Sequence, residues 1–336
     1  MRRWLGIGVW VLTAGAVLAL YALAPHLVSD FHSRDLAQAG VFFIAIVGLN
    51  ILTGYTGQIS LGHGALMAVG GYTTAALAVH EHWRDVWTIP LAGIAAGVVG
   101  FLIGLPALRL SGIYLALATF AFAVAMPSLL KKFSGLTGGG QGLRLLEQAP
   151  LQVTGLSGTV TIFGHTTTQN HFLYYLTWGI GLIAFVIAWL IVRGRLGRTF
   201  RAVRDSEVAA ASVGIDLART KTLAFAISGV YAGVAGALLA IQAEIVNPLS
   251  FTFLLSILLL VGAVVGGLGS LPGMVVGAFF VQYVPELSTR ISSKPGVPDF
   301  LYGAAIILVM ILLPTGAGGL LRRVARPLTT RLYLRP

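Results

Sequence analysis

Long apolar runs separated by short polar segments form most of the chain. Ten runs of 16 to 22 residues approach the roughly 17–25 residues that a helix needs to cross a bilayer. Charged side chains stay out of the middle of these runs, because a charge in hydrocarbon costs about 3 kcal/mol or more. The pattern predicts an all-α polytopic membrane protein with about ten transmembrane helices in a single domain, residues 1–336. The predicted spans are 4–24, 36–54, 59–79, 86–107, 112–130, 172–192, 222–242, 251–267, 272–287 and 299–314.

Glycine-rich breaks interrupt the apolar pattern at corresponding places in the two halves of the chain. Residues 45–72 pass through the break at 54–57, and residues 255–283 pass through a similar break at 266–269. Gly-interrupted segments in two halves point to a transport site near the interface of the repeats. The eighth and ninth runs meet at the second break, so they form either one long broken helix or two short helices.

Composition agrees with a membrane protein and excludes several chemistries. Of the 336 residues, 57% are hydrophobic and 10% are charged, whereas soluble domains have about a quarter charged residues. The chain has no cysteine, which excludes disulfides, thiol chemistry and Cys-bound metal. Small-residue faces predict close helix packing, since glycines let two backbones approach. These faces are Gly93, Gly97, Gly100 and Gly104 on one segment and Gly229 and Gly233 on another.

The uneven distribution of charge predicts an orientation. With the N-terminus in the cytoplasm, 15 of the 22 Lys and Arg residues fall inside and 8 of the 11 Asp and Glu residues fall outside. The positive-inside rule therefore predicts that both termini are cytoplasmic. It also predicts an external loop at 131–171, a cytoplasmic loop at 193–221 and a basic cytoplasmic tail at 322–336. The net charge of +11 thus reflects membrane orientation and predicts no nucleic-acid partner.

Two further segments have two interpretations each. The first run follows Met1-Arg2-Arg3 and resembles a signal peptide, but at about 20 residues it is longer than a usual signal and is interpreted as a retained helix. The external loop contains a turn-rich stretch, 136–142, and a weakly alternating stretch, 153–163, that predicts a small hairpin. This loop is either a solvated connection or a lip that touches an external partner.

Polar residues near the first break are candidates for a translocation path. Polar groups at membrane depth need partners or a water-filled path. They either make hydrogen bonds between helices or line the path, and Tyr114 alternatively anchors a helix at the membrane interface. For His63 the structural role is favoured, and no group at ligand spacing accompanies it, so no metal is expected. The predicted path residues are Asn50, Gln58, His63, Tyr114 and Thr119.

Missing motifs indicate that the chain is not an enzyme and does not power transport by itself. No Gly-Lys dipeptide occurs, so no P-loop is present, and neither Gly-x-Ser-x-Gly nor His-Glu-x-x-His occurs. The spans lack the ionisable residues at depth that ion-coupled carriers usually need. Active transport would therefore take its energy from a partner that contacts a cytoplasmic element.

The loop at 193–221 contains such an element. Residues 198–213 are good helix formers without Pro or Gly, and Gly214 is a typical helix stop. We expect one short helix along the membrane surface, with Phe200, Val203, Val208 and Ala211 on its apolar side. A segment of this kind either binds anionic lipid or fits the small patch at 209–211 into a groove on a partner.

The order Glu207-x-Ala209-Ala210-x-x-x-Gly214 resembles the coupling-loop signature of ABC-importer permeases of the LivM type for branched-chain amino acids. The stricter form of that signature has one residue fewer between Glu and Gly. The resemblance covers most of residues 40–285, and the Gln58–Gly64 run is closer to LivM than to its partner permease, LivH. The other matching segments are 53–75, 109–123, 136–143, 218–238 and 253–278.

The resemblance implies a permease subunit in a bacterial inner membrane that moves branched-chain or related amino acids into the cytoplasm. It implies contact with the ATPase through Glu207, Ala209, Ala210 and Gly214, and no cofactor in this chain, because partner subunits bind ATP. The implied partners are a LivH-like permease, two cytoplasmic ATPases and an external solute-binding protein. A urea or amide permease of the same family and a stand-alone channel or facilitator remain as alternatives.

Overall fold

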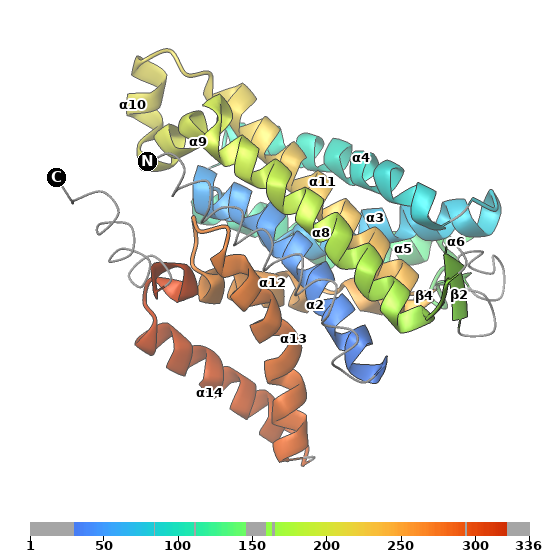
Figure 1. The fold of residues 1–336 in the computed structure, drawn as a ribbon. Helices are drawn as coiled ribbons and strands as arrows, with labels where there is room; N and C mark the ends of the chain where they lie inside the picture. Colours follow the sequence, from blue (N-terminus) through green and yellow to red (C-terminus); the bar gives the residue numbers. More distant parts are fainter. Residues whose placement is uncertain are drawn as a thin grey trace, which may run out of the picture.

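The computed structural model describes residues 30–83, 85–110, 112–145, 159–162, 165–292 and 294–320 (Figure 1). The predicted first span, 4–24, and the basic tail, 322–336, lie outside these residues. The α-helices are α2 (Asp30–Leu49), α3 (His63–His80), α4 (Asp85–Gly104), α5 (Ile113–Lys132), α6 (Ser134–Thr137), α8 (Gln169–Arg193), α9 (Arg195–Asp205), α10 (Glu207–Ser212), α11 (Leu217–Ala243), α12 (Phe253–Gly266), α13 (Gly273–Ile291) and α14 (Val297–Leu312).

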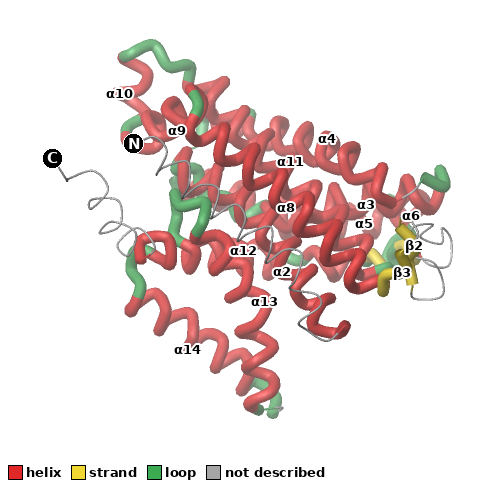
Figure 2. The backbone as a smooth tube through the Cα atoms, in the orientation of Figure 1, coloured by secondary structure: helices red, strands yellow, loops and turns green. Residues whose placement is uncertain are grey.

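Shorter elements connect these helices. A π-helix, η1 (Asn50–Tyr55), continues α2, and two 3-10 turns are η2 (Pro106–Leu108) and η3 (Pro248–Phe251). Strand β1 (Leu143–Arg144) pairs antiparallel with β4 (Ile245–Val246), and β2 (Thr159–Ile162) pairs antiparallel with β3 (His165–Thr168). Figure 2 shows that helices make up nearly all of the described chain and that the strands gather at one end.

Six helical segments of the described chain are long and apolar enough to cross a membrane. This confirms the prediction of an all-α multi-pass membrane protein, whereas the count of ten stays a prediction. The predicted spans 59–79 and 272–287 form α3 and α13, and 251–267 forms the 14-residue α12. The six segments are His32–Tyr55, Val86–Leu108, Ile113–Lys132, Gln169–Arg193, Leu217–Ala243 and Val297–Leu320.

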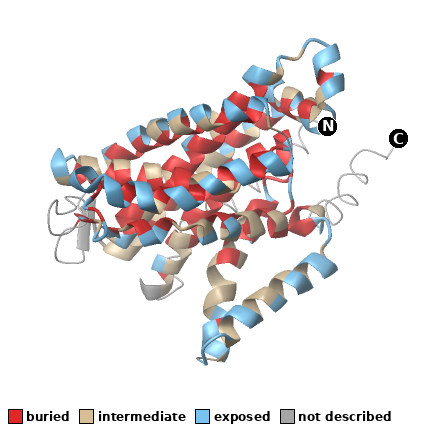
Figure 3. Cartoon of the chain, turned by 180° about the vertical axis from the view of Figure 1, so that it is seen from behind, coloured by how far each residue is buried: buried red, intermediate tan, exposed pale blue. Residues whose placement is uncertain are grey.

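Helices α2 and α11 lie in the core, whereas α14 lies at the periphery (Figure 3). Most of α11 is buried because α2, α3 and α4 all pack against it. By contrast, none of the side chains in α14 is fully buried. A helix that is apolar all round is either in a protein core or in contact with lipid, so the exposed apolar surface of α14 fits a membrane-facing helix.

Glycines bring α4 and α11 into close contact. A Cβ atom at Gly229 would lie 2.5 Å from the Ala96 carbonyl oxygen, and one at Gly100 would lie 2.6 Å from the Phe225 carbonyl oxygen. Neither space admits a side chain. The predicted role of these small-residue faces in helix packing is thereby confirmed. We call this contact the α4–α11 seam.

The two glycine-rich breaks are real interruptions. At the first, η1 ends in a turn in which Gly57 has φ +75° and the Gln58 amide donates to the Leu52 carbonyl at 3.1 Å. At the second, α12 ends at Gly266, and Gly267 and Gly269 have φ +94° and +78°. The eighth and ninth runs are therefore two separate helices. Glycine stands at the turn between them because residues with a side chain resist such positive φ angles.

The described residues of the predicted external loop lie at the end of the molecule opposite α9 and α10 (Figure 1). Its turn-rich stretch has positive φ at Gly138, Gly139 and Gly142, and β1 of this loop pairs with β4 just after α11. Within this loop β2 (159–162) and β3 (165–168) pair with each other. The predicted hairpin stretch, 153–163, is described only at 159–162, because residues 146–158 and 163–164 lie outside the described chain. We call the end that carries α9 and α10 the loop end.

Candidate functional site

The loop at 193–221 forms two helices, α9 and α10, instead of the single predicted helix over 198–213. The break falls at Ser206, whose backbone is extended (φ −164°, ψ 115°) and whose Oγ accepts a hydrogen bond from the Ala209 amide at 3.2 Å. Serine favours this N-cap position because its side chain satisfies an amide that has no partner within the helix. The prediction of one continuous helix was therefore wrong.

The break at Ser206 also changes which side chains are covered. Phe200 and Val203 are buried as predicted, but Val208 is 82% exposed and Ala211 is exposed as well. The predicted continuous apolar side thus holds for α9 and fails for α10. The exposed surface of α10 and its end consists of Val208, Ala209, Ala211, Ser212, Val213 and Gly214. Of the predicted coupling residues, Ala209 and Gly214 lie on this surface.

Ala210 lies on the inner side of α10, where it is only 2% exposed. Of the small patch at 209–211, therefore, only the first and last residues face outward. A larger side chain at position 210 would disturb the packing of the loop itself. The exposed neighbour Val208 is the better position at which to test contact with a partner.

Gly214 ends α10, as the sequence predicted, and does so in a left-handed backbone conformation. It has φ +83°, its amide donates to the Ala211 carbonyl, and the Ile215 amide donates to the Ala210 carbonyl, both at 3.0 Å. These two bonds form a Schellman motif, which closes a helix through a left-handed residue. A Cβ atom at Gly214 would meet nothing within 4 Å, so the backbone angle and not crowding favours glycine here.

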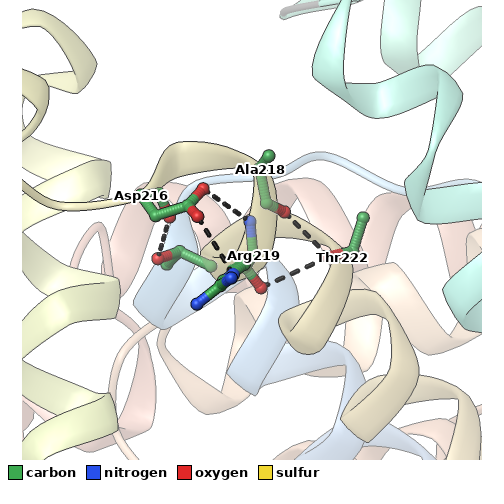
Figure 4. A network of polar contacts seen from close by, with 5 residues as sticks. Asp216, Ala218, Arg219 and Thr222 are labelled. Atoms are coloured by element: carbon green, nitrogen blue, oxygen red, sulfur yellow. Dashed lines mark hydrogen bonds and ion pairs between the residues drawn. The ribbon is translucent and has the colours of Figure 1, made fainter.

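Asp216 starts α11 immediately after this turn (Figure 4). Its Oδ1 accepts from the Arg219 amide at 3.0 Å, and its Oδ2 lies 3.2 Å from Nε of Arg219. The Thr222 hydroxyl donates to the Ala218 carbonyl at 2.7 Å within the first turns of the helix. An N-cap carboxylate stabilises a helix start, so α10 and α11 are joined by a short connection with defined ends.

Glu207 faces the body of the protein. Nζ of Lys221 lies 2.8 Å from its carboxylate, and Nε2 of Gln58 donates to its Oε1 at 3.4 Å. The Lys221 side chain is only 4% exposed and that of Glu207 is 38% exposed. The first residue of α10 is thus bound both to α11 and to the chain that follows η1.

Arg204 makes a second contact between the loop and the first break. Its Nη1 donates to the Gly54 carbonyl at 3.0 Å. A Cβ atom at Gly57 would lie 2.9 Å from Cγ of Arg204, so glycine serves both the turn and this close approach. The last turn of α9 therefore lies directly against the end of η1.

Asn50 joins the two breaks. Its fully buried side chain accepts from the Gly269 amide at 2.8 Å and donates to the Ser270 carbonyl at 3.4 Å. The sequence predicted corresponding breaks in two halves, and the structure shows that they touch. We use the term junction for Asn50, Gln58, Arg204, Glu207 and Lys221, which connect the loop with both breaks.

The remaining predicted path residues, Thr119, His63 and Tyr114, are not part of the junction. Thr119 is buried, and its Oγ1 accepts from the Leu61 amide at 2.9 Å. Nε2 of the buried His63 lies 2.9 Å from the Ala45 carbonyl oxygen. Tyr114 is 68% exposed at the start of α5, away from the junction. Four of the five path candidates therefore have hydrogen-bond partners within the chain, and a role in translocation stays a prediction for all five.

Sequence reasoning missed Arg204 and Lys221 as site residues. Both were counted only as orienting charges in the basic loop. Lys221 directly precedes a predicted span, and an ionisable residue at the edge of an apolar run was a signal that a partner should be sought. Within the described chain, no group of three or more His, Asp or Glu side chains could hold a metal ion.

A multi-pass helical body with interrupted helices and a capped helix pair at one end fits a membrane permease. The chain belongs to the family described as "Branched-chain amino acid transport system / permease component", whose model matches residues 33–310. Members of this family are components of transport systems and not enzymes.

Individual relatives agree with this membership. The chain is 33% identical over 315 residues to the high-affinity branched-chain amino acid transport system permease protein LivM of Escherichia coli, covering 90% of this chain and 73% of the relative. It is 26% identical over 288 residues to LivH of Salmonella typhimurium, covering 83% and 91%. BraD of Pseudomonas aeruginosa is 22% identical over 308 residues, covering 85% and 94%. The comparison with solved structures gives no match.

Proposed function

We propose that this chain is the transmembrane permease subunit of an ABC importer that carries branched-chain or related amino acids into the cytoplasm. The observation that carries the proposal is the outer surface of α10. Val208 is 82% exposed on a short helix that lies between two candidate spans, and Val213, directly after that helix, is 76% exposed. Exposed apolar side chains gathered on one small element mark an interaction surface.

The ATPase subunit is the partner that best fits this surface. The chain has no P-loop, so energy for active import has to enter through a contact. Helix α10 offers apolar side chains outward, while Ser206 and Gly214 define its two ends. By likeness to LivM and LivH, a second permease, a second ATPase and an external solute-binding protein complete the proposed assembly.

Co-purification tests the proposed contact. Val208→Glu places a charge on the outer surface of α10 and should abolish recovery of the ATPase subunits with the permease. Leu136→Glu is the matched control, because Leu136 is also exposed but lies at the opposite end in α6. Equal recovery of the ATPases with both variants would show that α10 is not the contact.

The proposed localisation is the bacterial inner membrane, with ten spans, both termini in the cytoplasm and the loop end on the cytoplasmic side. Single cysteines can be placed at the exposed positions Ser206 and Gln141, because the parent chain has none. A membrane-impermeant thiol reagent should label intact cells at position 141 and not at 206. Labelling at 206 from outside would reverse the orientation.

A further inference from the structure

The junction brings the loop, α11 and the two helix breaks into one set of polar contacts. Lys221 carries a charge that is almost completely removed from solvent, and Glu207 is its carboxylate partner at 2.8 Å. Removing a charge from water is costly unless an opposite charge compensates for it. The position of α10 relative to α11 is therefore tied to this ion pair.

The same carboxylate reaches the first break. Gln58 donates to Glu207, and the backbone of Gln58 is itself held, since its carbonyl accepts from the Thr53 hydroxyl at 3.1 Å. Its amide closes the turn at the end of η1. A displacement of Glu207 is thus passed through the Gln58 side chain to a backbone that two hydrogen bonds hold in the turn.

Arg204 adds a contact of a different kind. It donates to Gly54, a carbonyl in η1. Carbonyls at the end of a helix lack partners in the helix, and a guanidinium is a strong donor for such an oxygen. The loop therefore contacts the first break at two points, one from α9 and one from α10.

Asn50 extends this contact to the second break. It lies in the first turn of η1 and binds the backbone of both Gly269 and Ser270. The order of contacts is α10 to Glu207, Glu207 to Gln58, and η1 through Asn50 to the turn between α12 and α13. The outer surface of α10 takes part in none of these bonds and stays free for a partner.

We propose that Glu207 is a positioning residue that acts inward: with Lys221 and Arg204 it transmits movement of α10 to both helix breaks, and it does not itself bind the ATPase. This inference rests on the proposed function and assigns a role within it. It changes the expectation from the sequence, in which Glu207 was grouped with the residues that contact the ATPase.

Substitutions that remove, reverse or exchange the charges of Glu207 and Lys221 test the role of their ion pair. Glu207→Gln keeps the shape and removes the charge, and Lys221→Glu sets two carboxylates against each other. Each variant should retain the ATPase subunits and hydrolyse ATP, while amino-acid uptake per ATP hydrolysed falls about tenfold, within the range usual for coupling between sites. The exchange variant with both Glu207→Lys and Lys221→Glu should restore most of the coupling ratio. Membrane level and thermal stability are measured for every variant.

The outcomes separate the roles. If the ion pair is merely structural, uptake and ATP hydrolysis fall together with the amount of folded protein, and uptake per ATP hydrolysed is unchanged. That result would overturn the proposal. Loss of the ATPases in Glu207→Gln but not in Lys221→Glu also overturns it, because Glu207 would then be an ATPase contact. If the wild-type chain binds no ATPase, the importer function itself is wrong, and the role of the junction falls with it.

Discussion

The α4–α11 seam and the junction at the loop end both bring distant backbone segments together, but their chemistry differs. In the seam, glycines such as Gly229 leave room for the backbone of the other helix, and the contact is apolar. In the junction, Asn50, Arg204 and Glu207 use hydrogen bonds and an ion pair. Apolar contacts of this kind fix how closely helices approach, whereas directed polar contacts fix which atoms move together. The seam should therefore determine folding, and the junction should determine coupling.

The largest effect is expected in the seam. Gly229→Val would place side-chain atoms where the Ala96 backbone lies, and overpacking of this kind typically costs about 1–3 kcal/mol and occasionally more. We expect a fall in the membrane level and in the melting temperature, with transport lost in proportion. Gly303→Val in α14 is the matched control, since a Cβ atom there meets nothing within 4 Å. Similar melting temperatures for the two variants would contradict close packing at the seam.

A comparable loss of stability but a larger loss of function per folded permease is expected at Asn50. Asn50→Leu leaves the Gly269 amide and the Ser270 carbonyl buried without this partner. Leaving a buried polar group unsatisfied lowers the free energy of unfolding by about 1–3 kcal/mol. Uptake per folded permease should fall. Asn50→Asp keeps the acceptor for Gly269 and should retain more uptake than Asn50→Leu. If uptake falls only in proportion to the amount of folded permease in both variants, Asn50 contributes to folding, as the seam does, and not to coupling.

A Gly214→Val substitution should leave the rest of the permease folded. A β-branched residue at φ +83° is strained by about 1–2 kcal/mol, but the space around this position is open. Gly214→Val should therefore redirect the chain after α10 and abolish ATPase association at a normal membrane level. Gly214→Asn is the control, because asparagine tolerates left-handed angles. Normal ATPase recovery with Gly214→Val would argue that α10 only binds lipid.

Gln58 should show the smallest effect on stability. Its bond to Glu207 is long, at 3.4 Å, and a typical hydrogen bond contributes about 0.5–1.5 kcal/mol. Gln58→Leu should reduce uptake while the complex still assembles, as measured by vesicle uptake and subunit recovery. Full uptake at a normal level of the complex would assign Gln58 to helix packing alone.

Local features were predictable from the sequence. The apolar runs predicted the helices, and the glycines predicted the two breaks, the seam and the end of the helix at Gly214. These predictions succeed because each depends on a few neighbouring residues. The helix break at Ser206 was also local, but a run of good helix formers concealed the capping preference of a single serine.

The partners within the junction were not predictable in the same way. Gln58 and Glu207 are separated by 149 residues, and Asn50 and Gly269 by 219 residues. Nothing in either local sequence indicates that these segments meet. The inward position of Ala210 likewise follows from how α10 packs, which a pattern of small residues cannot specify.

We propose that transport through this permease is driven from the loop end. The most direct test of this proposal is uptake of labelled leucine into proteoliposomes that hold the permease pair, with and without the ATPase subunits, in the presence of the binding protein and ATP. We expect uptake that requires both the ATPases and ATP and that the Val208→Glu substitution abolishes. Leucine entry at an unchanged rate without the ATPases would contradict it and would identify a stand-alone facilitator.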